Sequence, residues 1–277
     1  KNIGTNLIQQ VRFTIGGHEI QKYTGNYLQN FVERDFDESK KKLFDIMTGN
    51  IEELNDPAKY YNGNYPNTFN FSEDDINNNI LPSIRNRRLY IPINIWFTLM
   101  SKMAFPLVSL QYNELQIEFK LRPITELFVV RDINNPVLKD YTQTEYISVN
   151  TNNNSFHLYR FLQQPPLQIL NGNSHDKYPN NNNNWNSNIH ILANYCFLDK
   201  DEVNVFTSRP QQYLIKECKE YNFYNLIGSN LVELETKGLV TNFMWFVQRA
   251  DIYMRNEWSN YTNWKYSDII PNIPNRV

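Results

Sequence analysis

The sequence predicts an all-β protein with minor helices, arranged as antiparallel β-sandwiches. Short runs in which apolar and polar residues alternate recur along the chain, and this period of two is typical of half-buried strands. Long polar stretches separate these runs and helical patterns are few, which together favour a sandwich or a jelly roll. Of the 277 residues, 41% are hydrophobic and 14% are aromatic, so a sizeable core is expected.

Composition and charge exclude several other classes of protein. Asparagine occurs 42 times and glycine only 9 times, which excludes collagen, and the chain has the pattern of neither a coiled coil nor a disulfide-rich miniprotein. The 27 basic residues nearly balance the 29 acidic ones. Nucleic-acid binders usually carry a basic excess, so direct contact with nucleic acid is not expected. No apolar run reaches the length of about 18 residues that indicates a transmembrane helix.

The first elements predicted are a β-hairpin and a helical stretch. Residues 7–15 alternate as a strand does, Gly16 and Gly17 supply the turn, and residues 18–23 form the return strand. Residues 26–47 place apolar side chains at helical spacing.

The remainder of the first unit is predicted to be a long loop followed by short elements. Residues 50–86 form the loop, residues 88–93 a strand, and residues 95–99 one helical turn. Residues 115–121 alternate most clearly of all and predict a strand, with an extension over residues 124–130.

A polar, asparagine-containing stretch at residues 132–156 predicts a linker between two units. The first unit then covers residues 1–131 and the second covers residues 157–277. In the second unit the asparagine-rich residues 171–188 predict an exposed loop, because such tracts bury too little apolar area to order themselves. Strands are predicted at residues 188–197, 212–218, 231–236 and 239–249, a short helix at 199–206, and irregular chain at 251–264.

No pattern of residues predicts catalysis, and no cofactor or metal site is expected. The four histidines form no metal-binding motif, and neither a nucleophile elbow nor a phosphate-binding glycine loop occurs. Cys196 and Cys218 are expected to be reduced core or strand thiols. Three asparagines lie in Asn-x-Ser/Thr sequences and are candidate glycosylation sites: Asn70, Asn153 and Asn260.

A set of turn, proline and aromatic residues carries the most information in the chain. Trp96 and Phe97 provide large apolar area beside a strand, and Pro106 directs the chain toward the next one. The full set is Gly16, Gly17, Pro92, Trp96, Phe97, Pro106, Leu107, Tyr112 and Glu114.

In this order the set resembles the major capsid protein of the nucleocytoplasmic large DNA viruses, the giant-virus group. That family has a strand ending in Ile-Gly-Gly, then a Pro-x-x-x-Trp-Phe stretch, then a Pro-Leu-containing stretch that leads into a strand. Residues 195–206, 212–215 and 255–264 resemble the family's second domain, so the similarity extends from about residue 7 to residue 264. The chain lacks the family's earliest strands and the end of its second domain, begins without Met, and therefore resembles a central piece of a longer protein.

The resemblance implies a double jelly roll of which this chain covers parts of both halves. It also implies a non-enzymatic role, in which homotrimers form pseudo-hexagonal capsomers of an icosahedral virus shell. The expected partners are neighbouring capsomers and minor capsid proteins. The expected location is the capsid of the virion, with assembly in the host cytoplasm. The stretches at 50–86 and 171–188 become candidates for the outer loops.

Two other functions remain compatible with the same pattern. A minor capsid or scaffold protein can be built on the same fold. A carbohydrate-binding or carbohydrate-cleaving β-sandwich would use the abundant aromatic side chains for sugar stacking, and a hydrolase would add a pair of carboxylates. A lectin would bind glycans as a monomer, whereas a capsid protein should form trimers and bind no ligand.

Overall fold

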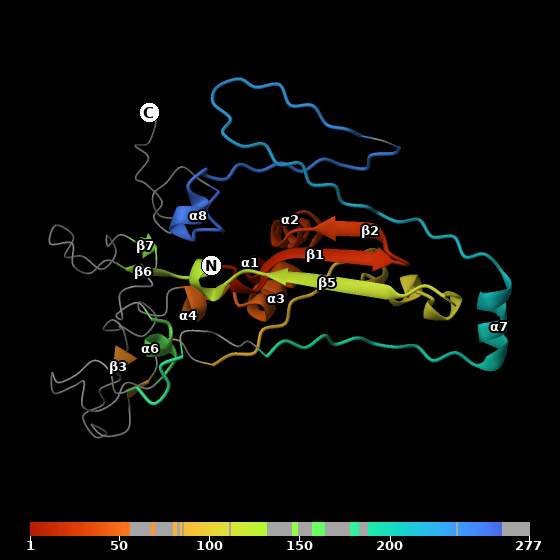
Figure 1. The fold of residues 1–277 in the computed structure, drawn as a ribbon, viewed down its shortest axis with the longest axis horizontal. Helices are drawn as coiled ribbons and strands as arrows, with labels where there is room; N and C mark the ends of the chain where they lie inside the picture. Colours follow the sequence, from red (N-terminus) through yellow and green to blue (C-terminus); the bar gives the residue numbers. More distant parts are fainter. Residues whose placement is uncertain are drawn as a thin grey trace.

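A three-stranded antiparallel sheet lies at the centre of the computed structural model (Figure 1). Its strand order is β2-β1-β5, with β1 at Ile8–Ile15, β2 at His18–Tyr23 and β5 at Leu115–Leu121, so all three strands lie where the sequence predicts them. The structure describes residues 1–55, 68–69, 80–81, 84, 86–110, 112–131, 146–148, 157–163, 178–182, 188–236 and 238–261.

The predicted hairpin is confirmed in position and turn. Gly16 and Gly17 have φ angles of 54° and 81°, the left-handed region that a two-residue turn of this kind requires at both positions. The Gly16 N–H donates to the carbonyl of Glu114, with an N···O distance of 3.0 Å. The turn is therefore tied to the chain that enters β5. A bulge between Phe13 and Thr14 interrupts the register of β1 with β2.

The helical stretch after the hairpin is confirmed, but it consists of two helices. Helix α2 covers Gly25–Asp35 and helix α3 covers Glu38–Thr48, and short helices α1 (Ile3–Leu7) and α4 (Glu52–Asn55) flank them. The break falls at Asp37, whose carboxylate accepts a hydrogen bond from the Lys40 N–H at 2.8 Å and so caps α3. Figure 1 shows α2 and α3 beside the sheet.

Gly25 allows α2 to start in close contact with α1 and β1. A Cβ atom at this position would lie 2.0 Å from the carbonyl oxygen of Thr5 and 2.7 Å from that of Ile8. Both neighbours are backbone atoms, so no side-chain movement can relieve the clash.

Replacing Gly25 by alanine is therefore expected to lower the free energy of unfolding by about 3 kcal/mol, the upper range for overpacking a core. Gly17→Ala is the control, because Gly17 has nothing within 4 Å of the added atom and only its left-handed φ is disfavoured. That variant should cost about 1–2 kcal/mol. Urea unfolding of both variants measures the difference, and equal costs would contradict a steric role for Gly25.

The segment between α4 and β5 contains three turns of 3₁₀ helix: η1 (Trp96–Thr98), η2 (Ser101–Met103) and η3 (Leu107–Ser109). The predicted helical turn at 95–99 is confirmed by η1. The strand predicted at 88–93 is wrong, because these residues are irregular. Among the described residues, the Tyr90 N–H donates to the carbonyl of Met47 at 2.8 Å, which is not a strand ladder. A proline in the middle of the stretch also removes one ladder donor.

Two further strand pairs lie outside the central sheet. Strand β3 (Thr68–Phe69) pairs with β4 (Ile80–Leu81), and β6 (Val129–Arg131) pairs with β7 (Tyr146–Ser148) after the 3₁₀ turn η4 (Ile124–Glu126). Strand β7 lies inside the stretch predicted to be a linker at 132–156. The predicted extension at 124–130 is a 3₁₀ turn followed by the start of β6.

In the described residues that follow, helices form at α6 (Tyr159–Leu162), α7 (Lys200–Ser208) and α8 (Ile252–Arg255). The helix predicted at 199–206 is confirmed by α7, which begins with a reciprocal capping box between Asp199 and Glu202. Helix α8 corrects the prediction of an irregular stretch at 251–264. Within the asparagine-rich stretch, Tyr178 is buried against Tyr159, whereas Asn180–Asn182 are exposed as predicted.

The strands predicted on either side of α7 are wrong for the described residues. The stretches at 188–197, 212–218, 231–236 and 239–249 carry no strand, and most of their side chains are exposed. Figure 1 shows the chain beyond α7 making a wide loop before it returns to α8. Alternation selects the face that a strand would bury, but a strand also needs a neighbouring backbone at about 4.8 Å. The part of the chain that the structure describes supplies no such neighbour here.

Candidate functional site

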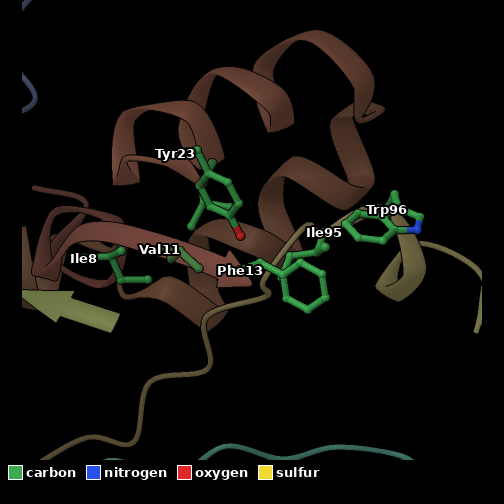
Figure 2. Packing of buried hydrophobic residues seen from close by; sticks show 7 residues of the cluster. Ile8, Val11, Phe13, Tyr23, Ile95 and Trp96 are labelled. Carbon is green, nitrogen blue, oxygen red and sulfur yellow. The ribbon is translucent and has the colours of Figure 1, made fainter. Parts of the chain in front are cut away.

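An aromatic cluster that includes part of the sequence motif packs against the sheet and forms the hydrophobic core of the described residues. Phe13 of β1 is fully buried, at 0% exposure, and its ring lies 5.2 Å from that of Trp96 in an edge-to-face arrangement. The ring of Phe97 lies 5.4 Å from that of Phe13, and the ring of Phe105 lies 6.3 Å away. Figure 2 shows Phe13, Ile95 and Trp96 together within the core. These contacts join β1 to the chain that follows α4.

The motif residues divide into a packing group and a surface group. Trp96 is buried, Phe97 lies half-buried in the cluster, and Gly16 contacts the backbone of Glu114. Pro92 and Pro106 are half-buried on either side of the cluster. Leu107, Tyr112 and the side chain of Glu114 are exposed, with Tyr112 at 95%.

Several packing residues were not selected from the sequence. Ile95 is fully buried between β1 and η1, and an alternating or helical pattern gives no signal for it. The ring of Tyr213, more than one hundred residues downstream, lies 6.2 Å from that of Phe105. Such a contact has no local signal, because it depends on the path of the intervening chain.

A second row of aromatic rings connects β2 to α2 and α3. The ring of Tyr23 lies 5.0 Å from that of Tyr27, which lies 6.0 Å from that of Phe31. Burial raises the pKa of Tyr27 to about 12 and, beside it, the pKa of the Cys218 thiol to about 12. The Cys218 thiol is therefore protonated at neutral pH and is not an activated nucleophile. Cys196 is exposed, so the expectation of a core or strand thiol is wrong there.

Trp258 anchors the turn after α8 to the end of the central sheet. Its side chain is 6% exposed, and its Nε1–H donates to the carbonyl of Glu126 at 2.6 Å. The guanidinium of Arg122, just after β5, lies 3.6 Å from the centre of the Trp258 ring system. Burial lowers the pKa of Arg122, and the nearby Glu126 carboxylate partly opposes this effect. Asn256 adds a hydrogen bond to the Thr125 carbonyl at 2.7 Å.

The candidate glycosylation sites differ in what the structure describes. Asn260 is 2% exposed and its Nδ2 donates to Glu257 Oε2 at 3.2 Å, so the folded chain leaves no room for a glycan at this nitrogen. Asn70 and Asn153 lie outside the described residues, and their modification stays a prediction.

No chemical centre accompanies the packing in the described part of the chain. Within that part, no three or more His, Cys, Asp or Glu side chains gather in a group that could hold a metal ion. None of the described helices is long and apolar enough to cross a membrane. The described residues form a sheet, an aromatic cluster packed against it, and a long extended segment between α7 and α8, here called the downstream arm.

Comparison with known proteins identifies the class to which this arrangement belongs, that of virus shell proteins. The major capsid protein of Chrysochromulina ericina virus is 24% identical over 251 residues, which are 88% of this chain and 37% of that protein. The major capsid protein of Frog virus 3 (isolate Goorha) is 30% identical over 131 residues, which are 47% of this chain and 25% of that protein. The matched residues thus span between a quarter and just over a third of the length of these relatives.

A family model also matches the chain. Residues 1–199 match the family described as the major capsid protein N-terminus, and the chain belongs to that family. Among solved structures, VP54 of PBCV-1, fitted into a reconstruction of the virophage Sputnik, is 22% identical with a TM-score of 0.30. That similarity covers 43% of this chain and 22% of VP54.

Proposed function

We propose that this chain is part of a major capsid protein that builds a virus shell. The observation that carries the proposal is the family match over residues 1–199, which contains the hairpin, β5 and every residue of the aromatic motif. A shell subunit needs a rigid core with long external loops and no reactive centre. The buried cluster around Phe13 supports that requirement.

The proposed complete fold is a double jelly roll. Residues 1–131 would belong to the first jelly roll and residues 157–277 to the second, with the connection between them at 132–156. The downstream stretches at 212–218 and 239–249 support this arrangement, because each contains an apolar run of the kind found in buried strands, at 213–215 and 243–247, yet exposes its large apolar side chains. Unpaired strands of this kind are an aggregation hazard, so a partner strand is expected to cover them.

The proposed assembly is a homotrimer that forms a pseudo-hexagonal capsomer of an icosahedral shell. Its partners would be neighbouring capsomers and minor capsid proteins in the virion, after assembly in the host cytoplasm. Stable obligate interfaces are large and apolar. Exposed apolar side chains are concentrated downstream of α7 and are candidates for such an interface, namely Leu214, Ile227, Leu231, Leu239 and Trp245.

The mass in solution, measured by light scattering on a size-exclusion column, tests the trimer. The expected result is three times the 33.1 kDa mass of one chain. A well-folded monomer that binds glycans on an array would contradict the proposal and support a carbohydrate-binding sandwich. Trp245→Asp is a useful second sample, because a charge at this 86% exposed position should weaken trimers without disturbing the core.

A further inference from the structure

The arm downstream of α7 touches the first part of the chain at three points within eight residues. The ring of Tyr213 lies 6.2 Å from that of Phe105, and Cys218 packs half-buried against the hydrophobic core. Glu220 Oε1 accepts hydrogen bonds from the Thr24 N–H at 2.9 Å and from the Thr24 hydroxyl at 3.0 Å. Within this one extended segment, Tyr213 therefore contacts an aromatic ring, Cys218 contacts the apolar core, and Glu220 contacts hydrogen-bond donors.

The Glu220 contact supplies what the start of α2 lacks. Thr24 is the N-cap of this helix, but its side chain makes no capping hydrogen bond to the helix backbone, and the first turn of α2 contains no acidic residue. A helix N-terminus carries partial positive charge and free N–H groups, so it favours a carboxylate.

In helix α7, a carboxylate from the helix's own first turn accepts the hydrogen bond at the N-terminus. There Glu202, three residues after the N-cap Asp199, accepts a hydrogen bond from the Asp199 N–H at 3.0 Å. In α2 the corresponding residue is Tyr27, which has no carboxylate. Glu220 makes the equivalent bond from 196 residues away.

We propose that residues 213–220 form the joint that holds the downstream arm on the central sheet, with Glu220 as the residue that recognises the start of α2. The surface at Thr24 and Tyr27 thus fits one partner, a carboxylate-bearing extended segment of this same chain. The register of the segment supports the assignment. Cys218 and Glu220 face the helix, whereas Glu217 pairs with the exposed Lys219 between them, at 3.8 Å.

Glu220→Ala in the full chain tests the joint, with Glu217→Ala as the matched control. Both substitutions remove one carboxylate near Cys218, but only the first removes a bond to α2. We expect Glu220→Ala to accelerate amide exchange at the start of α2 about fivefold, the size of one lost helix cap. It should also accelerate alkylation of Cys218, while the exposed Cys196 reacts at an unchanged rate in every variant.

Thr24→Val provides the second variant, since it removes the hydroxyl partner and keeps the shape of the side chain. If Thr24 and Glu220 form one joint, the double variant should expose Cys218 no more than Glu220→Ala alone. The proposal is overturned if Glu220→Ala and Glu217→Ala behave alike, or if the effects of the Thr24 and Glu220 substitutions simply multiply. Circular dichroism of each variant confirms that the helices remain folded during the measurement.

Discussion

Phe13→Ala is expected to lower the free energy of unfolding by about 3–5 kcal/mol, the range for truncating a buried aromatic residue. Phe13 is fully buried and its ring is in contact with those of Trp96, Phe97 and Phe105. The substitution removes the shared member of these edge-to-face and tilted pairs. It also leaves a cavity that the strand backbone cannot close. Denaturant unfolding, followed by tryptophan fluorescence, measures the loss.

Phe197→Ala is the matched control for this experiment. Phe197 is 95% exposed, so the same chemical change should alter the free energy of unfolding by no more than about 0.5 kcal/mol. A loss below about 1 kcal/mol for Phe13→Ala would contradict the assignment of the aromatic cluster as the packing centre.

Trp258→Ala is expected to lower the free energy of unfolding by a similar amount, about 3–5 kcal/mol. It should also release the turn after α8 from the sheet. The side chain is almost fully buried, covers the guanidinium of Arg122 and donates to the Glu126 carbonyl. Its removal exposes that carbonyl and the cation to water together. Amide exchange over residues 251–261 should rise with the loss of stability measured by denaturant unfolding.

Two further substitutions separate the contributions of Trp258. Trp258→Phe keeps an aromatic face over Arg122 but removes the N–H, and should cost about 1 kcal/mol for the lost hydrogen bond. Trp245→Ala removes an indole that is 86% exposed on one chain, so it should leave the free energy of unfolding of the monomer nearly unchanged when both variants are measured at a concentration where the chain is monomeric. Equal losses in Trp258→Ala and Trp245→Ala would show that the turn is not anchored by Trp258.

The elements that the sequence predicts well are those whose hydrogen bonds are local or whose turn chemistry is specific. Helix α7 follows from its acidic first turn, because a helix completes its bonds within its own segment. The hairpin follows from alternation together with two consecutive glycines that tolerate left-handed φ angles. In both cases the deciding interactions lie within a few residues.

The elements that the sequence predicts poorly depend on distant partners. The continuous apolar run at 243–247 predicts a strand buried on both faces. Strand β5 pairs with β1, whereas this downstream stretch has no neighbouring strand among the described residues. The contact of Trp258 with Arg122 and that of Glu220 with Thr24 also depend on chain path rather than on local pattern. Trp96 and Phe97 lie in the core, and large aromatic side chains beside a strand are a local signal for such packing.

The abundance of this chain in purified virus particles tests its proposed role most directly. Quantitative mass spectrometry with isotope-labelled standards would count two tryptic peptides, residues 13–22 from the hairpin and residues 201–216 from α7 and the chain that follows it. A major capsid protein should yield both peptides in equal amounts and at a copy number that exceeds those of the other virion proteins. A copy number far below that of another shell protein, or absence from the particles, would contradict the account and would favour a minor capsid or scaffold role.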